Sequence, residues 1–150
     1  MRSHGRLTGL FLAVGASLVA LTAGADTPTT AVLTMRLSLK NSGGQVGCAL
    51  YNSEKGFPRD PNAALQVKWC AISNSESVCA FNPIPAGTYA VACFHDENKN
   101  GKLDTGLFSK PTEGTVSSNN AKGFMGPPSF KDAKFSFPGT PTELRLKMNY

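Results

Sequence analysis

Thr88-Tyr89-Ala90-Val91-Ala92-Cys93-Phe94 is the most informative run in this chain of 150 residues. Successive side chains of a β-strand point to opposite faces, and in this run both faces are mainly apolar. A strand with two apolar faces lies inside a folded domain, with other strands beside it. The run therefore predicts a central, buried strand over residues 88–94.

Shorter strand patterns recur on both sides of this run, with turn residues between them. Residues 32–40 and 142–148 alternate between apolar and polar side chains, which predicts two half-buried strands. Residues 60–65 predict one turn of helix, because Asp60 suits the cap and Pro61 suits the first helical position. Four more segments carry strand signals, namely residues 45–51, 67–72, 78–81 and 135–137. We therefore expect an all-β fold, a single seven-stranded immunoglobulin-like β-sandwich with one short helix.

The first 25 residues have the organisation of a secretory signal peptide. Arg2 and Arg6 precede an apolar run over residues 10–21, and the small residues Ala23-Gly24-Ala25 follow it. The apolar run is shorter than the ~20 residues that span a bilayer, and no cysteine follows it to carry a lipid anchor. We therefore predict export to the periplasm or the medium, no membrane span, and one mature domain over residues 26–150.

The charge of the chain gives little support for nucleic acid as a partner. The formal net charge is +5, but Arg2 and Arg6 would leave with the signal peptide. The remaining lysines are scattered, without a basic run or interleaved aromatic residues. We therefore expect no nucleic acid binding.

All four cysteines lie in the predicted mature domain. An even number of cysteines in an exported chain favours disulfides, and no spacing here fits a zinc site. Asn74-Ser75 predicts a hairpin turn, and that hairpin would place Cys70 opposite Cys79 within bridging range. Cys48 and Cys93 then remain for each other. A second turn, Asn41-Ser42-Gly43-Gly44, predicts a hairpin between the first two strands.

An acidic loop follows the central strand directly. Its sequence is Asp96-Glu97-Asn98-Lys99-Asn100-Gly101-Lys102-Leu103-Asp104. Oxygen-bearing side chains at alternate positions followed by glycine are typical of a D-x-[DN]-x-[DN]-G calcium loop. The predicted Ca²⁺ ligands are the side chains of Asp96, Asn98, Asn100 and Asp104 and the backbone carbonyl of Lys102.

The calcium pattern of this loop is incomplete. The twelfth position, which carries a bidentate Glu in an EF-hand, is Leu107. Glu113, Asn119, Asn120 or a backbone carbonyl would have to complete the shell, and we expect a low affinity of ~10⁻⁴–10⁻³ M. Asn100-Gly101 also suits a plain type I′ turn without metal, so the sequence leaves both interpretations open.

Residues 105–129 show little periodicity and predict a long ordered loop. Its apolar members are Phe108, Phe124, Met125 and the neighbouring Phe130. They either pack the loop onto the sandwich or line a ligand groove. We expect the acidic loop to hold this segment in place as a recognition surface.

Catalytic groups are sparse. His95 is the one histidine of the mature part, and on a strand its side chain points away from that of Asp96. Ser117, Ser118 and Ser129 do not lie in a Gly-x-Ser-x-Gly elbow. A metal-assisted hydrolase using His95 and Asp96 is therefore an alternative to the binding interpretation, and a carrier of a small apolar ligand is another.

Several motifs carry a resemblance to known families. Ile84-Pro85-Ala86-Gly87-Thr88-Tyr89-Ala90-Val91 resembles the turn and strand of transthyretin-like and Cna-B-type sandwich modules. The acidic loop, together with Gly56-Phe57-Pro58, Ser118-Asn119-Asn120-Ala121 and Gly126-Pro127-Pro128-Ser129-Phe130, is similar to domain-of-unknown-function family 2141. That resemblance implies export and a transthyretin-like sandwich, but no activity.

These observations together predict an exported, non-enzymatic binding or structural module. Its acidic loop, with or without Ca²⁺, would order residues 105–129. The expected partner is a protein or polysaccharide of the envelope or the extracellular space.

Overall fold

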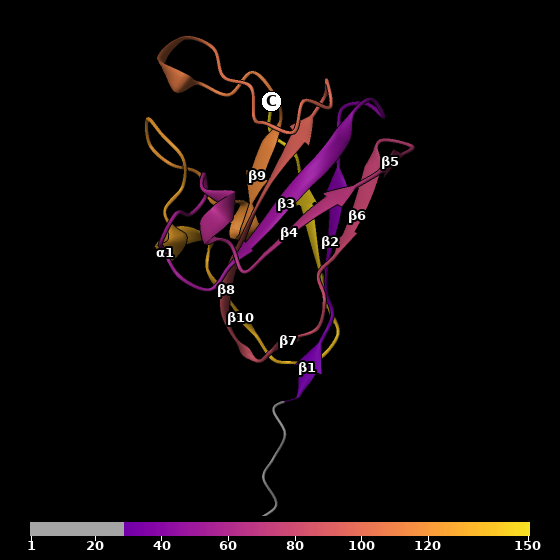
Figure 1. Ribbon diagram of the computed structural model, residues 1–150, viewed down its shortest axis with the longest axis vertical. Helices are drawn as coiled ribbons and strands as arrows, with labels where there is room; N and C mark the ends of the chain where they lie inside the picture. Colours follow the sequence, from indigo (N-terminus) through magenta and orange to yellow (C-terminus); the bar gives the residue numbers. More distant parts are fainter. Residues whose placement is uncertain (1–28) are drawn as a thin grey trace, which may run out of the picture.

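The computed structural model describes residues 29–150 and contains two larger β-sheets and one short two-stranded sheet (Figure 1). Buried side chains of the larger sheets form one hydrophobic core. The predicted signal peptide lies outside the described residues. The larger sheet has the order β10-β8-β3-β4, with β9 also paired to β8. Its strands are β3 (Gln45–Tyr51), β4 (Gln66–Cys70), β8 (Gly87–Asp96), β9 (Thr115–Ser117) and β10 (Phe135–Phe137).

The second sheet has the order β11-β2-β6-β5, in which β11 runs parallel to β2. Its strands are β2 (Leu33–Ser38), β5 (Ile72–Ser73), β6 (Glu76–Ala80) and β11 (Thr142–Lys147). A further short pair joins β1 (Thr30–Ala31) to β7 (Ile84–Pro85). Within residues 29–150, no helix has the length and apolar character needed to cross a bilayer.

The alternating pattern of β2 explains how the core forms. Leu33, Met35 and Leu37 are fully buried, while Thr34 and Arg36 on the other face are partly exposed. The predicted central strand is confirmed, because β8 pairs with β3 along one edge and with β10 and β9 along the other. The all-β sandwich is therefore confirmed.

The predicted number of seven strands is wrong, since residues 29–150 form eleven. The additional strands are β1, β5, β7 and β9, each only two or three residues long. Such short segments contain too few residues to show a period of two.

The predicted hairpin between the first two strands is also wrong, because β2 and β3 belong to different sheets. The chain crosses between the sheets at Gly43-Gly44. Gly44 has a φ of +73°, and a Cβ atom there would overlap the backbone carbonyl of Asp96. This crossing therefore brings residues 43–45 against the end of β8.

The structure brings both predicted cysteine pairs to disulfide distance. Cys48 and Cys93 lie directly opposite each other on β3 and β8, with Cα atoms 4.1 Å apart. Cys70 and Cys79 have Cα atoms 5.6 Å apart, but their bridge joins the two sheets rather than two strands of one hairpin. The turn at Asn74-Ser75 is as predicted, but the strands that it joins are β5 and β6. Cys70 comes before β5, at the end of β4 in the larger sheet.

The predicted one-turn helix is present as the 3₁₀ helix η1 (Pro61–Ala63). The Asp60 side chain accepts a hydrogen bond from the Asn62 N–H at 3.0 Å, as the capping pattern predicts. Besides η1, the described residues contain two 3₁₀ helices and one short α-helix that the sequence patterns did not place. They are η2 (Leu107–Ser109), η3 (Ser118–Asn120) and α1 (Phe130–Ala133).

The predicted long loop is divided into two projections by β9, in which Val116 is buried. We call residues 105–112 finger 1 and residues 121–128 finger 2. Both project to the same side of the sandwich in the view of Figure 1. Backbone bonds close the base of finger 1, where the Thr112 N–H donates to the Asp104 carbonyl at 2.9 Å.

Candidate functional site

The acidic loop begins with a buried carboxylate. Asp96, the last residue of β8, is fully buried. Its Oδ2 accepts hydrogen bonds from Gln45 Nε2 and the Gly101 N–H, each at 2.9 Å. Its Oδ1 accepts from the Asn100 N–H at 3.0 Å. The carboxylate therefore gathers the backbone of the loop around itself.

These hydrogen bonds set the ionisation of Asp96. Burial by itself would raise the pKa of this carboxyl group. The Gln45 amide and the backbone N–H groups of Gly101, Asn100 and Lys99 favour the charged form and outweigh burial, so the pKa lies below its ordinary value. Asp96 is thus an anion that organises the loop, not a proton donor at neutral pH.

The exposed half of the loop is held by a second carboxylate. Asn98 Nδ2 donates to Asp104 Oδ2 at 2.6 Å, and Asn100 Nδ2 donates to Asp104 Oδ1 at 2.9 Å. Asn98 Oδ1 accepts from the Asn100 N–H at 3.1 Å, and Asn100 Oδ1 accepts from the Lys102 N–H at 2.8 Å. Of the five predicted ligand residues, four are therefore brought together by their side chains and Lys102 by its backbone.

The two amides turn their NH₂ groups toward Asp104 and their oxygens toward backbone donors. Turning either amide over would set its NH₂ group against a backbone N–H and its oxygen against the Asp104 carboxylate. The backbone donors thus fix Asn98 and Asn100 with NH₂ groups, rather than oxygens, facing Asp104. A cation needs oxygen ligands at that place. Within residues 29–150, no group of three or more His, Cys, Asp and Glu residues is arranged to hold a metal ion.

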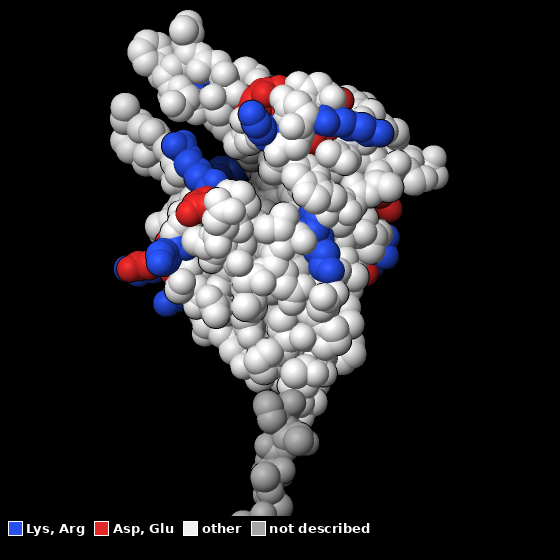
Figure 2. Space-filling model, in the orientation of Figure 1, with Lys and Arg blue, Asp and Glu red and all other residues white. Residues whose placement is uncertain are grey.

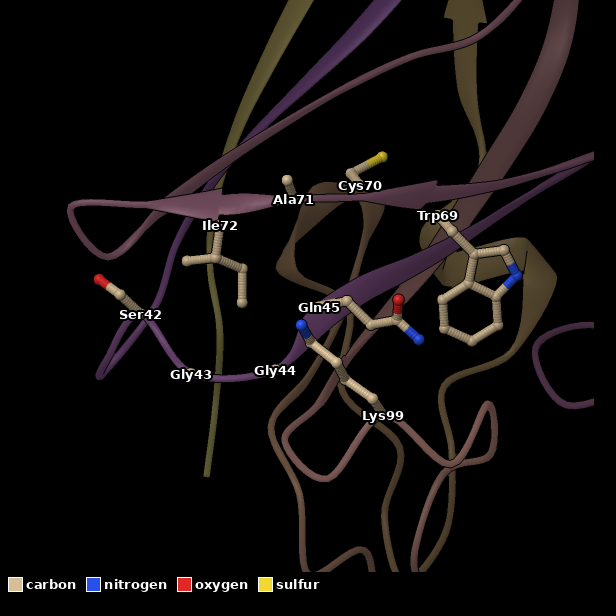
Figure 3. Close-up of a pocket in the computed structure, with 9 residues that line it drawn as sticks. All are labelled: Ser42, Gly43, Gly44, Gln45, Trp69, Cys70, Ala71, Ile72 and Lys99. Carbon is tan, nitrogen blue, oxygen red and sulfur yellow. The ribbon is translucent and has the colours of Figure 1, made fainter.

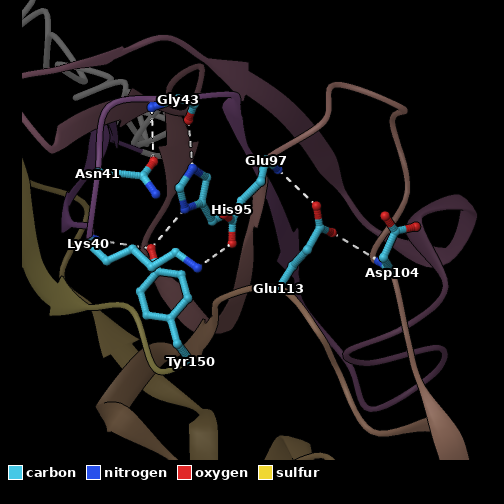
Figure 4. A network of polar contacts seen from close by, with 8 residues as sticks. All are labelled: Lys40, Asn41, Gly43, His95, Glu97, Asp104, Glu113 and Tyr150. Carbon is cyan, nitrogen blue, oxygen red and sulfur yellow. Dashed lines mark hydrogen bonds and ion pairs between the residues drawn. The ribbon is translucent and has the colours of Figure 1, made fainter.

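Glu113 joins the acidic loop to finger 1 (Figure 4). Its carboxylate is buried and accepts from the Glu97 N–H at 2.8 Å through Oε1 and from the Asp104 N–H at 3.0 Å through Oε2. We call this arrangement of Asp96, Asp104 and Glu113 the carboxylate brace. The sequence suggested Glu113 as a twelfth calcium ligand, and the structure places it at the loop as a hydrogen-bond acceptor for two backbone donors.

His95 is enclosed on both sides of its ring. It is fully buried, with Nδ1 2.8 Å from the Tyr150 hydroxyl and Nε2 2.7 Å from the Gly43 carbonyl oxygen. The Tyr150 hydroxyl also accepts from the Lys40 N–H at 3.2 Å. The Lys40 ammonium lies 4.3 Å from the Tyr150 ring centroid and 2.8 Å from Glu97 Oε1. His95 therefore ties the sheet crossing to β8.

Two of the three serines singled out in the sequence, Ser118 and Ser129, make structural hydrogen bonds. Ser118 is buried, accepts from the Val91 N–H at 2.9 Å and donates to the Ala133 carbonyl at 2.6 Å. Ser129 caps α1 and donates to Asp132 Oδ2 at 2.6 Å. Asn119 donates to the Lys134 carbonyl at 2.8 Å, beside α1, so it does not complete the acidic loop.

A surface hollow of about 450 Å³ lies between the sheet crossing and the end of β4 (Figure 3). Trp69, Lys99 and Gln45 line part of it. The Gln45 amide already donates to Asp96, and Cys70 at the rim is bridged to Cys79. The hollow therefore offers an aromatic surface and an ammonium group, but no acid–base pair.

Gln45 and Tyr150 were missed at the sequence level. Gln45 pairs with Asp96 in the β3–β8 register, which depends on the sheet crossing that the sequence did not predict. Tyr150 reaches His95 from a position 55 residues away along the chain. No local pattern marks either contact.

The chain matches the sequence model of one protein family. The sequence model described as "Uncharacterized protein conserved in bacteria (DUF2141)" matches residues 37–145. No curated protein and no solved structure matches the chain. The transthyretin-like detail of the fold therefore stays a prediction.

Proposed function

Because this chain belongs to DUF2141, a family of uncharacterised bacterial proteins, we propose its function from its own geometry: it is an exported, non-enzymatic binding module. The sandwich is a rigid base, and fingers 1 and 2 are its contact elements. Its site of action is the periplasm or the medium. Two cysteine pairs at disulfide distance support export, since such bonds persist in oxidising compartments.

The position of Glu113 is the main observation that supports the proposal. Its carboxylate accepts from Glu97 at the start of the acidic loop and from Asp104 at its end. Charge-assisted hydrogen bonds of this kind are stronger than neutral ones. The base of finger 1 is thereby fixed to the strand end of β8. This suits a contact element, because a segment that is already ordered loses little further conformational freedom on binding.

The surroundings of His95 support a non-enzymatic role. A general base must reach the proton that it removes, and both ring nitrogens of His95 already contact protein atoms. Asp96 lies in the loop with its oxygens bound to Gln45, Asn100 and Gly101. The alternative of a hydrolase that uses these two residues would require both sets of contacts to break.

Ca²⁺ at the acidic loop stays a prediction. The ion would compete with the backbone donors for the Asn98 and Asn100 oxygens, which is consistent with the low affinity of ~10⁻⁴–10⁻³ M that we expect. The carrier alternative would need space in the core, where Leu33, Leu37 and Leu50 are fully buried against their neighbours.

Sedimentation of the mature domain with isolated bacterial envelopes tests the proposal. We expect retention of the wild type and loss of most of that retention when Phe108 and Phe124 are both changed to Ser. Trp69→Ser is the matched control, because it removes an exposed aromatic ring from another surface. If the finger variant is retained as well as the wild type, the fingers are not contact elements and the proposal fails.

A further inference from the structure

The tips of both fingers expose large apolar side chains almost completely. Leu107 and Phe108 on finger 1 are 84% and 101% exposed, and Phe124 and Met125 on finger 2 are 96% and 94% exposed. Large exposed apolar patches on soluble proteins mark binding surfaces. The sequence left open whether these residues pack the loop onto the sandwich, and at Phe108, Phe124 and Met125 they do not.

The backbone presents these side chains outward. Phe108 and Ser109 have φ values of +58° and +57°, and Met125 has a φ of +57°. Residues other than glycine rarely adopt this left-handed region, and such residues cluster at functional positions. Phe130, by contrast, packs edge-to-face on Phe57 with ring centroids 5.8 Å apart. The apolar residues at the base are thus packed, and those at the tips are free.

The charge of the fingers is of one sign. Lys110 lies two residues after Phe108, and Lys122 lies two residues before Phe124. Neither residues 105–112 nor residues 121–128 contain Asp or Glu. The carboxylates of the brace, Asp104 and Glu113, lie at the base of finger 1 rather than at its tip. Figure 2 shows the two fingers as pale projections on one side of the molecule, with blue and red side chains nearer their bases.

Resting on the proposed function, we infer that the fingers bind the interface of a lipid bilayer that carries anionic headgroups. The apolar tips would enter the boundary between headgroups and acyl chains, while Lys110 and Lys122 would stay at the level of the phosphates. Two separate convex tips suit a fluid surface, because a protein partner would need two pockets at a matching spacing. A cationic flank without carboxylates complements an anionic surface.

Co-sedimentation with vesicles tests this inference. The probes are vesicles of phosphatidylglycerol and phosphatidylcholine in the ratio 3:7 and vesicles of phosphatidylcholine alone, with the mature wild-type domain. We expect binding to the anionic vesicles that weakens with salt, and weaker binding to the neutral ones. Changing Leu107 and Phe108 to Ser, or Phe124 and Met125 to Ser, should each weaken binding by about tenfold or more.

Charge reversal and a surface control complete the design. Lys110→Glu with Lys122→Glu should lower affinity for anionic vesicles by about tenfold or more, since each basic residue near the surface contributes to attraction. Trp69→Ser should bind as the wild type does. The finger substitutions replace exposed side chains, whereas Trp69 is 47% exposed and packs edge-to-face on Phe94. Circular dichroism therefore verifies the fold of each variant, the control included.

Three outcomes separate this inference from the proposed function. Finger-dependent binding to anionic vesicles supports it. Finger-dependent retention on envelopes without binding to either vesicle overturns the inference and leaves the binding module standing, with a protein or polysaccharide partner. Independence from the fingers in both assays overturns both proposals.

Discussion

Replacing both Cys48 and Cys93 by Ala is expected to lower the free energy of unfolding by about 4 kcal/mol. This bridge closes a segment with a sequence separation of 45 residues, and it links β3 to the central strand β8. Without it, the unfolded chain gains the conformational freedom that the cross-link removes. Alanine suits both buried positions, so little of the loss would come from overpacking. Urea unfolding of the purified mature domain measures the change.

The second cysteine pair provides the comparison. Cys70 and Cys79 are only nine residues apart in the sequence, so replacing them by Ala should cost less, about 3 kcal/mol. A loss below about 1 kcal/mol for the Cys48 and Cys93 variant would show that this bridge does not clamp the larger sheet.

Asp96→Ala is expected to destabilise the domain by about 3 kcal/mol. The substitution removes the acceptor for Gln45 Nε2 and for the Asn100 and Gly101 N–H groups. Hydrogen bonds to a charged acceptor contribute about 1.5–3 kcal/mol each, and water reaching the opened loop restores part of the loss. Asp104→Ala is the matched control in the same loop, and it should cost about 1 kcal/mol or less, because its amide partners are exposed. Equal losses would contradict the central position of Asp96.

The pH dependence of stability gives an independent check on Asp96. Its pKa in the folded protein is below the ordinary value of 3.8, so the unfolded chain binds this proton more tightly. Its contribution to stability is therefore complete above about pH 5 and is lost as the pH falls through 3.8 and then through the lower folded pKa. Asp96→Ala should flatten the stability curve over that acidic range, and an unchanged slope would contradict this assignment.

The sequence predicts those parts of the fold that depend on residues close to one another along the chain. The alternation of β2, the two apolar faces of β8 and the cap at Asp60 each depend on neighbouring residues, and all are confirmed. Local patterns do not reveal to which sheet a strand belongs, because that depends on packing between distant segments. Gly43-Gly44 reads as a hairpin turn, and only the packing of β3 against β8 makes it a crossing between sheets.

The sequence predicts only the local part of the candidate site, and it misses the contacts that come from distant segments. The alternate oxygens of the acidic loop are a local pattern, and they gather as expected. Gln45 and Glu113, which bond Asp96 and the loop backbone, reach the loop from other segments, so no local pattern marks their contacts. β9, which separates the two fingers, contains only three residues, too few to show the alternation of apolar and polar side chains that predicts a strand.

Amide hydrogen exchange of the acidic loop in the presence of EDTA tests the carboxylate brace most directly. Five N–H groups of the loop, those of Glu97, Asn100, Gly101, Lys102 and Asp104, donate to side-chain oxygens. The brace predicts that the Asn100 and Gly101 amides, bound to the buried Asp96, are protected by about 100-fold or more without any metal. Fast exchange of these two amides in EDTA, with protection restored by Ca²⁺, would contradict the brace and establish a calcium loop in its place.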